Sequence, residues 1–197
     1  MNVAHFLVRS ALRFPQRPLW LMPDRTITYA EGRTRLDAIA GGLLTLGKVG
    51  DRVAIVSTNR FEAFEIYLAA MHAGMAATPM NPKLHAKEYE HIILDSGASI
   101  VVYSAEFEET MQEIRQSLPS GDRVFCIGSK TTTSLGRDYE SLLTLSTTPF
   151  AGVNIDPGDL AWLFYTSGTT GRPKGAMETH RNLVTMVQQF LTSGLDA

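Results

Sequence analysis

Residues 52–80, RVAIVSTNRFEAFEIYLAAMHAGMAATPM, contain the pattern that decides the fold. The segment begins with Arg52–Val56, a short apolar run rich in β-branched residues, which predicts a buried strand. A helix is predicted next, because four apolar residues recur at the spacing of one helical face: Phe61, Phe64, Leu68 and Met71. Asn59 with Glu62 three residues later resembles a capping box at the start of that helix. A weaker strand pattern follows at Met75–Thr78, so this segment predicts two strands joined by a helix.

The same alternation of strand and helix patterns continues on both sides of this segment. Further apolar strand patterns lie at Ser99–Tyr103, Arg123–Ile127 and Leu160–Tyr165. Helical patterns lie at Tyr29–Leu46, at Tyr89–Gly97 and at Phe107–Leu118. Because strands alternate with helices, the predicted fold class is α/β, with a mostly parallel sheet flanked by helices.

A change of composition divides the chain into three predicted parts. Ten of the twenty residues at positions 129–148 are Ser or Thr, which is typical of an exposed connection. We therefore expect an α/β portion over residues 1–128 and a Ser/Thr-rich connection over residues 129–150. A short helical piece is predicted within that connection, near Tyr139–Leu145. Residues 151–197 then hold a strand, the loop after it and a following helix.

Composition and charge exclude several classes of protein. The 197 residues carry 18 Lys and Arg against 20 Asp and Glu, so we expect no nucleic-acid partner. Cys126 is the single cysteine, which excludes an internal disulfide and a cysteine-based zinc site. No signal peptide or transmembrane segment is predicted, and no histidine spacing indicates a metal site. We expect a cytoplasmic location.

A glycine-rich segment follows the last predicted strand. Residues 166–175, TSGTTGRPKG, combine three glycines with four hydroxyl side chains, one arginine and one lysine. Glycines allow the backbone to approach a ligand closely, and successive N–H groups form a concave anion site. In α/β sheets, ligands bind at the carboxyl ends of the strands, so this segment predicts a polyphosphate site. It has neither a Walker A nor a G-x-G-x-x-G pattern, and from composition alone a surface turn is the alternative.

The segment also resembles a known family motif. Tyr165–Gly175, YTSGTTGRPKG, is similar to the signature phosphate loop of the AMP-forming adenylating superfamily, which includes acyl-CoA synthetases. The similarity continues through residues 175–183, GAMETHRNL. Upstream segments also resemble family motifs, in the family's order: TYAE at 28–31, GDRVAI at 50–55, HAGMAATPMNP at 72–82 and DSGA at 95–98.

The resemblance implies a two-step ligase reaction. A carboxylate attacks the α-phosphate of ATP, bound with Mg²⁺, to give an acyl-adenylate and pyrophosphate, and the thiol of coenzyme A then displaces AMP. A small-molecule carboxylate, ATP and coenzyme A are the implied partners. The asparagine of Asn81-Pro82 and the paired threonines Thr169-Thr170 favour acyl-CoA synthetases over peptide-synthetase domains. The resemblance also implies a place in fatty acid metabolism. The acid itself is left open.

The resemblance assigns binding roles to the residues of the glycine-rich segment. The residues implied to position ATP and to neutralise the leaving pyrophosphate are Thr166, Ser167, Thr169, Thr170 and Lys174. The glycines implied to permit close backbone approach are Gly168, Gly171 and Gly175. Arg172 and His180 are supporting candidates, and for His180 the alternative is a cap on the helix that begins near Thr179. No catalytic residue and no metal ligand are assigned.

The length of the chain implies only part of this family's architecture. The resemblance covers the first part of a large N-terminal domain, and no segment resembles the C-terminal domain that carries the family's catalytic lysine. We therefore expect a fragment of the ligase that is inactive alone. The alternatives are a module that binds ATP or pyrophosphate without catalysis and a structural half that complements a separate chain. A sheet interrupted in this way would expose an edge and an apolar face, so self-association is also expected.

Overall fold

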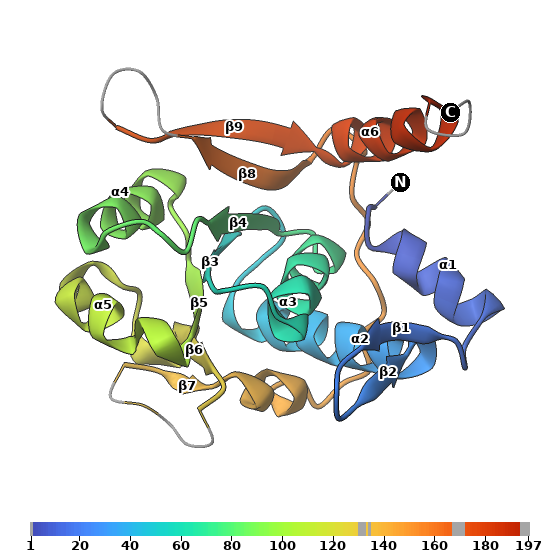
Figure 1. The fold of residues 1–197 in the computed structure, drawn as a ribbon, viewed down its shortest axis with the longest axis horizontal. Helices are drawn as coiled ribbons and strands as arrows, with labels where there is room; N and C mark the ends of the chain where they lie inside the picture. The colour runs from blue at the N-terminus through green and yellow to red at the C-terminus, as the bar shows by residue number, and fades with distance from the viewer. Residues whose placement is uncertain (1, 130–132, 134, 167–171, 194–197) are drawn as a thin grey trace.

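The computed structural model describes residues 2–129, 133, 135–166 and 172–193. The helices are α1 His5–Arg13, α2 Tyr29–Leu46, α3 Phe61–His72, α4 Ala86–Ser96, α5 Glu108–Glu113, the 3-10 helix η4 Tyr139–Thr144 and α6 His180–Ser193 (Figure 1). The strands are β1 Pro18–Leu21, β2 Thr26–Thr28, β3 Arg52–Val56, β4 Ala76–Met80, β5 Ile100–Ser104, β6 Val124–Ile127, β7 Arg137–Asp138, β8 Leu160–Thr166 and β9 Lys174–Thr179.

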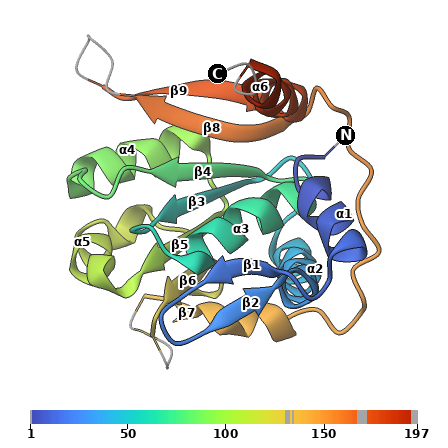
Figure 2. The same cartoon turned by 45° about the vertical axis from the view of Figure 1, so that its right-hand side comes forward.

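One twisted sheet organises the molecule. Its strands lie in the order β7-β6-β5-β3-β4-β8-β9, and all neighbours are parallel except β8 and β9. The strands β1 and β2 form a separate antiparallel hairpin beside α2 (Figure 2). This arrangement confirms the predicted fold class, a mostly parallel sheet flanked by helices.

Both faces of the sheet are covered. On β3, Val53 and Ile55 belong to the core shared with α2 and α3, whereas Ala54 and Val56 belong to the core shared with α4. The residues of β5 and β6 alternate between the same two cores. Figure 1 shows α4 and α5 on one side of the sheet and α1, α2 and α3 on the other. Strands buried on both faces explain why their sequences are continuous apolar runs.

The cap predicted for α3 is absent, whereas α2 spans the predicted residues Tyr29–Leu46. Asn59 does not cap α3, because that helix begins at Phe61 and its N-cap residue, Arg60, makes no side-chain capping bond. Thr28 and Glu31 instead form a capping box at the start of α2, where Oγ1 of Thr28 accepts from the Glu31 N–H and the Glu31 carboxylate accepts from the Thr28 N–H. This box gives a physical role to the TYAE segment.

Several elements were not predicted. The hairpin β1–β2, the two-residue strand β7 and the strand β9 lie in segments without a clear apolar periodicity. The predicted helix at residues 107–118 is divided into short pieces, of which only Glu108–Glu113 is α-helical. The short helical piece predicted near residues 139–145 is present as η4.

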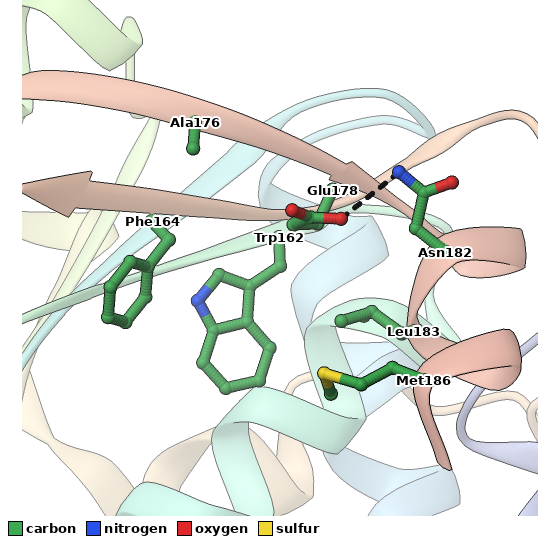
Figure 3. Close-up of a pocket in the computed structure, with 7 residues that line it drawn as sticks. All are labelled: Trp162, Phe164, Ala176, Glu178, Asn182, Leu183 and Met186. Carbon is green, nitrogen blue, oxygen red and sulfur yellow. Dashed lines mark hydrogen bonds between the residues drawn. The ribbon is translucent and has the colours of Figure 1, made fainter. Parts of the chain in front are cut away.

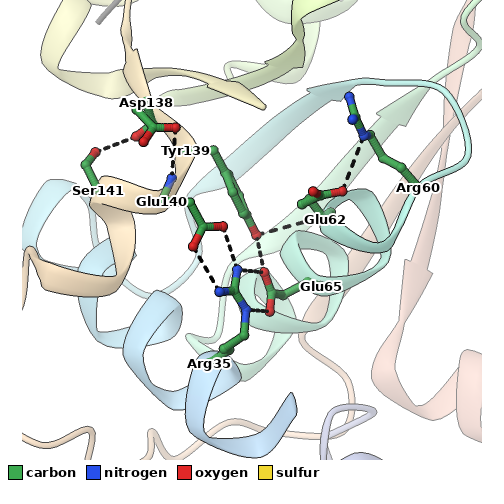
Figure 4. Close-up of polar contacts among 8 residues, drawn as sticks. All are labelled: Arg35, Arg60, Glu62, Glu65, Asp138, Tyr139, Glu140 and Ser141. Atoms are coloured by element: carbon green, nitrogen blue, oxygen red, sulfur yellow. Dashed lines mark hydrogen bonds and ion pairs between the residues drawn. The ribbon is translucent and has the colours of Figure 1, made fainter. Parts of the chain in front are cut away.

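A cluster of charged side chains joins α2, α3 and η4 (Figure 4). The guanidinium of Arg35 donates two hydrogen bonds to the Glu65 carboxylate, at 2.6 and 2.8 Å, and two to the Glu140 carboxylate, at 2.9 and 2.7 Å. The Tyr139 hydroxyl donates to Glu65 at 2.9 Å. Burial raises the pKa of Glu65, and the Arg35 cation opposes that rise. The cluster fixes three elements on one face of the sheet.

Candidate phosphate-binding site

The hairpin of β8 and β9 presents the predicted phosphate segment at the carboxyl end of β8. β8 is parallel to β4 through the pair Ala77 and Trp162, so Thr166 lies at the same edge of the sheet as the end of β4. In the antiparallel pairing of β8 with β9, Thr166 is opposite Lys174. The described part of the segment therefore begins at the carboxyl end of β8, at the edge where β4 also ends. The candidates Ser167, Gly168, Thr169, Thr170 and Gly171 lie outside the described residues.

The described ends of the segment are open to solvent. Thr166, Arg172 and Lys174 are all exposed, whereas Pro173 is half-buried. A lysine ammonium in this position is free to approach a polyphosphate as a point charge, with the Thr166 hydroxyl on the facing strand as a further donor. The pairing of Thr166 with Lys174 therefore brings a donor and a cation together at the mouth of the hairpin, which is the end where β8 finishes and β9 begins.

Gly175 lies within β9, opposite Tyr165. A Cβ atom at Gly175 would be 2.9 Å from Cζ of the Tyr165 ring, closer than real Cβ atoms approach. This glycine therefore leaves room for the tyrosine ring across the hairpin. The sequence predicted a backbone approach to ligand at this position, and the structure adds this second role.

His180 lies away from the mouth of the hairpin. It is the first residue of α6 and directly follows Thr179, the last residue of β9, whereas Lys174 is the first residue of that strand. It does not cap the helix, because the Asn182 N–H donates to Oγ1 of Thr179 instead. The His180 side chain is buried, and its Nδ1 accepts a hydrogen bond from the Val3 N–H at 3.2 Å. Burial lowers the pKa of His180 to about 4, so the imidazole is neutral at neutral pH.

An open apolar groove lies between the hairpin and α6. Its volume is about 490 Å³, and side chains from β8 and α6 project into it (Figure 3). The residues that line it are Trp162, Phe164, Ala176, Glu178, Asn182, Leu183 and Met186. Exposed apolar side chains continue from this groove along α6, where Phe190 is 76% exposed. Sequence periodicity did not reveal this surface, because β9 was not predicted.

The described residues contain no cluster of three His, Cys, Asp or Glu side chains that could hold a metal ion. Within the same residues, every helix is too short or too polar to cross a bilayer.

The chain belongs to the family of AMP-binding enzymes, within the AMP-forming adenylating superfamily. The family model described as AMP-binding enzyme matches residues 7–196. The fold and the position of the glycine-rich segment after β8 agree with this assignment.

The relatives include acyl-CoA ligases. A feruloyl-CoA synthase of Amycolatopsis sp is 34% identical over 181 residues, which are 89% of this chain and 33% of that protein. The long-chain-fatty-acid--CoA ligase FadD13 of Mycobacterium tuberculosis is 32% identical over 186 residues, which are 92% of this chain and 36% of that protein. The inhibitor-bound N-terminal domain of FACL13 from Mycobacterium tuberculosis superposes with a TM-score of 0.76 at 30% identity, over 91% of this chain and 44% of that one. The chain spans about a third of the length of these curated relatives.

Proposed function

We propose that this chain supplies the ATP-binding and pyrophosphate-binding portion of an AMP-forming acyl-CoA ligase. The observation that carries the proposal is the β8–β9 hairpin, which pairs Thr166 with Lys174 at the two ends of the family's phosphate segment. The complete ligase joins a small-molecule carboxylate to AMP, with release of pyrophosphate, and then transfers the acyl group to coenzyme A. Feruloyl-CoA synthase and FadD13 support carboxylic acids as the substrate class, with either aromatic or fatty acids as candidates.

In this proposal the residues of the segment neutralise negative charge. Transfer of the adenylyl group leaves additional charge on the departing pyrophosphate, and preorganised donors stabilise that charge. Lys174 contributes a cation, and Thr166, Ser167, Thr169 and Thr170 contribute hydroxyl donors. Gly168 and Gly171 allow close backbone approach, and Arg172 has a supporting role. Mg²⁺ enters with ATP as part of the substrate complex.

The first prediction concerns Lys174. Lys174→Ala is expected to weaken the binding of Mg·ATP or pyrophosphate about tenfold, because one charge-assisted contact of ~1.4 kcal/mol is lost. Titration calorimetry with each ligand measures the change. Stability against urea should stay within about 0.5 kcal/mol, since the side chain is exposed. Arg25→Ala, which removes an exposed cation between β1 and β2, is the control. Equal affinity in Lys174→Ala and wild type would contradict the assignment.

A second candidate function is that of a structural half that complements a separate polypeptide. The observation that favours it is the apolar groove between the β8–β9 hairpin and α6, together with the exposed side chains along α6. Exposed contiguous apolar surfaces of this kind mark sites of association. Pyrophosphate exchange with mixed carboxylates distinguishes the candidates. Exchange seen only after addition of the remaining part of an acyl-CoA ligase, which has no counterpart in this chain, supports complementation. Exchange by this chain alone refutes it.

The same surface predicts self-association of the isolated chain. Phe190→Glu is expected to reduce both the dimer or oligomer fraction in analytical ultracentrifugation and the binding of a hydrophobic dye, because a charge on the apolar surface opposes association. Leu12→Glu on α1 is the matched control, since Leu12 is 80% exposed but lies away from the groove. A monomeric wild type with little dye binding would contradict this prediction.

A further inference from the structure

Helix α4 contacts both sides of the phosphate segment, at Tyr165 in β8 and at Pro173, the residue before β9. On the first strand, the Tyr165 hydroxyl donates to Oδ2 of Asp95 at 2.7 Å. On the other side, Nε2 of His91 donates to the carbonyl oxygen of Pro173 at 3.2 Å. His91 and Asp95 are four residues apart, so they lie on one face of α4. A single helix therefore contacts both flanks of the segment.

Packing supports the Tyr165 contact. Its ring lies against the apolar core beneath α4, which includes Tyr89 and Ile92. The absent Cβ of Gly175 leaves space for this ring, since an added Cβ would be 2.9 Å from Cζ and 3.3 Å from the hydroxyl oxygen. Burial, and then the bond to the Asp95 carboxylate, raise the pKa of Tyr165, so the hydroxyl stays protonated and donates.

We propose that His91 and Asp95 are positioning residues. His91 sets the place of Lys174 through Pro173, and Asp95 sets the place of Thr166 through Tyr165. Tyr165 directly precedes Thr166, and Pro173 directly precedes Lys174. Each α4 contact is thus one residue from a described phosphate-binding candidate. A polyphosphate is bound most tightly when its donors are already in place, because less ordering is required on binding. The effect on ligand affinity rests on the proposed function, whereas the anchoring of the hairpin does not.

The proposal is tested in the 197-residue chain with four single variants, among them His91→Ala, which removes the donor to Pro173, and with the double variant of Tyr165→Phe and Asp95→Ala. Tyr165→Phe removes the donor, Asp95→Ala removes the acceptor, and Asp95→Asn keeps an oxygen acceptor in place. Amide hydrogen exchange is measured at Thr166, Lys174 and Gly175, and pyrophosphate affinity is measured by calorimetry. Glu109→Ala, an exposed carboxylate on α5, is the control.

Exchange at these three amides is expected to increase about fivefold in Tyr165→Phe and Asp95→Ala, as one net hydrogen bond is lost. Exchange within β3 should be unchanged. The dissociation constant for pyrophosphate should rise by a similar factor. The double variant of Tyr165→Phe and Asp95→Ala should differ little from either single variant, because both remove the same hydrogen bond. Asp95→Asn should keep exchange and affinity close to the wild-type values. His91→Ala should increase exchange at Lys174 more than at Thr166.

Wild-type exchange at these amides in both Tyr165→Phe and Asp95→Ala would overturn the proposal. So would altered exchange combined with unchanged pyrophosphate affinity, because positioning would then have no consequence for binding. If the wild-type chain binds neither pyrophosphate nor Mg·ATP, the proposed function fails, and the exchange data still decide whether α4 anchors the hairpin.

Discussion

Arg35→Ala is expected to destabilise the protein by about 3–5 kcal/mol, as happens when one partner of a buried ion pair is removed. The change leaves the Glu65 carboxylate, whose side chain is only 3% exposed, without its cation. It also removes the link between α2 and η4 that Arg35 makes through Glu140 (Figure 4). Urea denaturation followed by circular dichroism measures the loss.

The matched control is Glu140→Gln, which removes the other carboxylate bound to the same guanidinium. Glu140 is 52% exposed, so solvent screens its charge and the expected loss is below about 1 kcal/mol. If Arg35→Ala does not fold, Glu65→Gln provides the measurement, because it keeps the shape of the side chain without its charge. Equal losses in the two single variants Arg35→Ala and Glu140→Gln would contradict the dependence on burial.

The cost of Arg35→Ala should also depend on pH. Burial already raises the pKa of Glu65, and loss of the Arg35 cation raises it further. The folded variant therefore binds a proton at Glu65 at pH values where the unfolded chain does not. Its stability relative to wild type falls as pH rises above the unfolded pKa of about 4.5 and recovers in more acidic solution.

The second large effect is expected at His180. Its folded pKa of about 4 lies below the unfolded value of 6.5, so between these values the unfolded chain binds more protons. The contribution of this neutral, buried imidazole to stability is complete above pH 6.5 and declines as pH falls towards 4. The loss reaches about 3 kcal/mol at the lower end of this interval.

His180→Asn tests this expectation, because Asn keeps an oxygen that can accept from the Val3 N–H but does not titrate. The free energies of unfolding of variant and wild type are compared between pH 7 and pH 4. The variant is expected to gain relative to wild type as pH falls. His85→Asn, at an exposed position before α4, is the control and should keep the acid sensitivity of wild type. Parallel curves for His180→Asn and wild type would contradict the assignment.

The parts of the fold that the sequence predicted share one physical property. β3, β5 and β6 are buried on both faces, so burial alone required continuous apolar runs that stand out in the sequence. β9 was missed because the residues of its sequence, KGAMET, are exposed or half-buried, and the strand is held by pairing with β8 rather than by a buried face. Propensity and periodicity contain no signal for a strand of this kind.

The candidate site was predictable to a similar extent. The motif located Thr166 and Lys174, and the strand pattern predicted their place at the carboxyl edge of the sheet. The contacts from His91 and Asp95 were not predictable, because each joins residues about 70 to 80 positions apart and neither has a local pattern. Likewise, the bond between His180 and Val3 joins the two ends of the described chain. Such contacts depend on the completed topology.

The place of β8 in the sheet has a consequence for the chain during its synthesis. β8 pairs with β4, whereas the strands made in between are added on the far side of β3. The outer edge of β4 therefore stays open until residues 160–166 have left the ribosome, at a translation rate of about 5–20 residues per second. Pro79 in β4 has no N–H to offer an incoming strand. A proline in an open edge strand is one of the features that limit pairing with other chains.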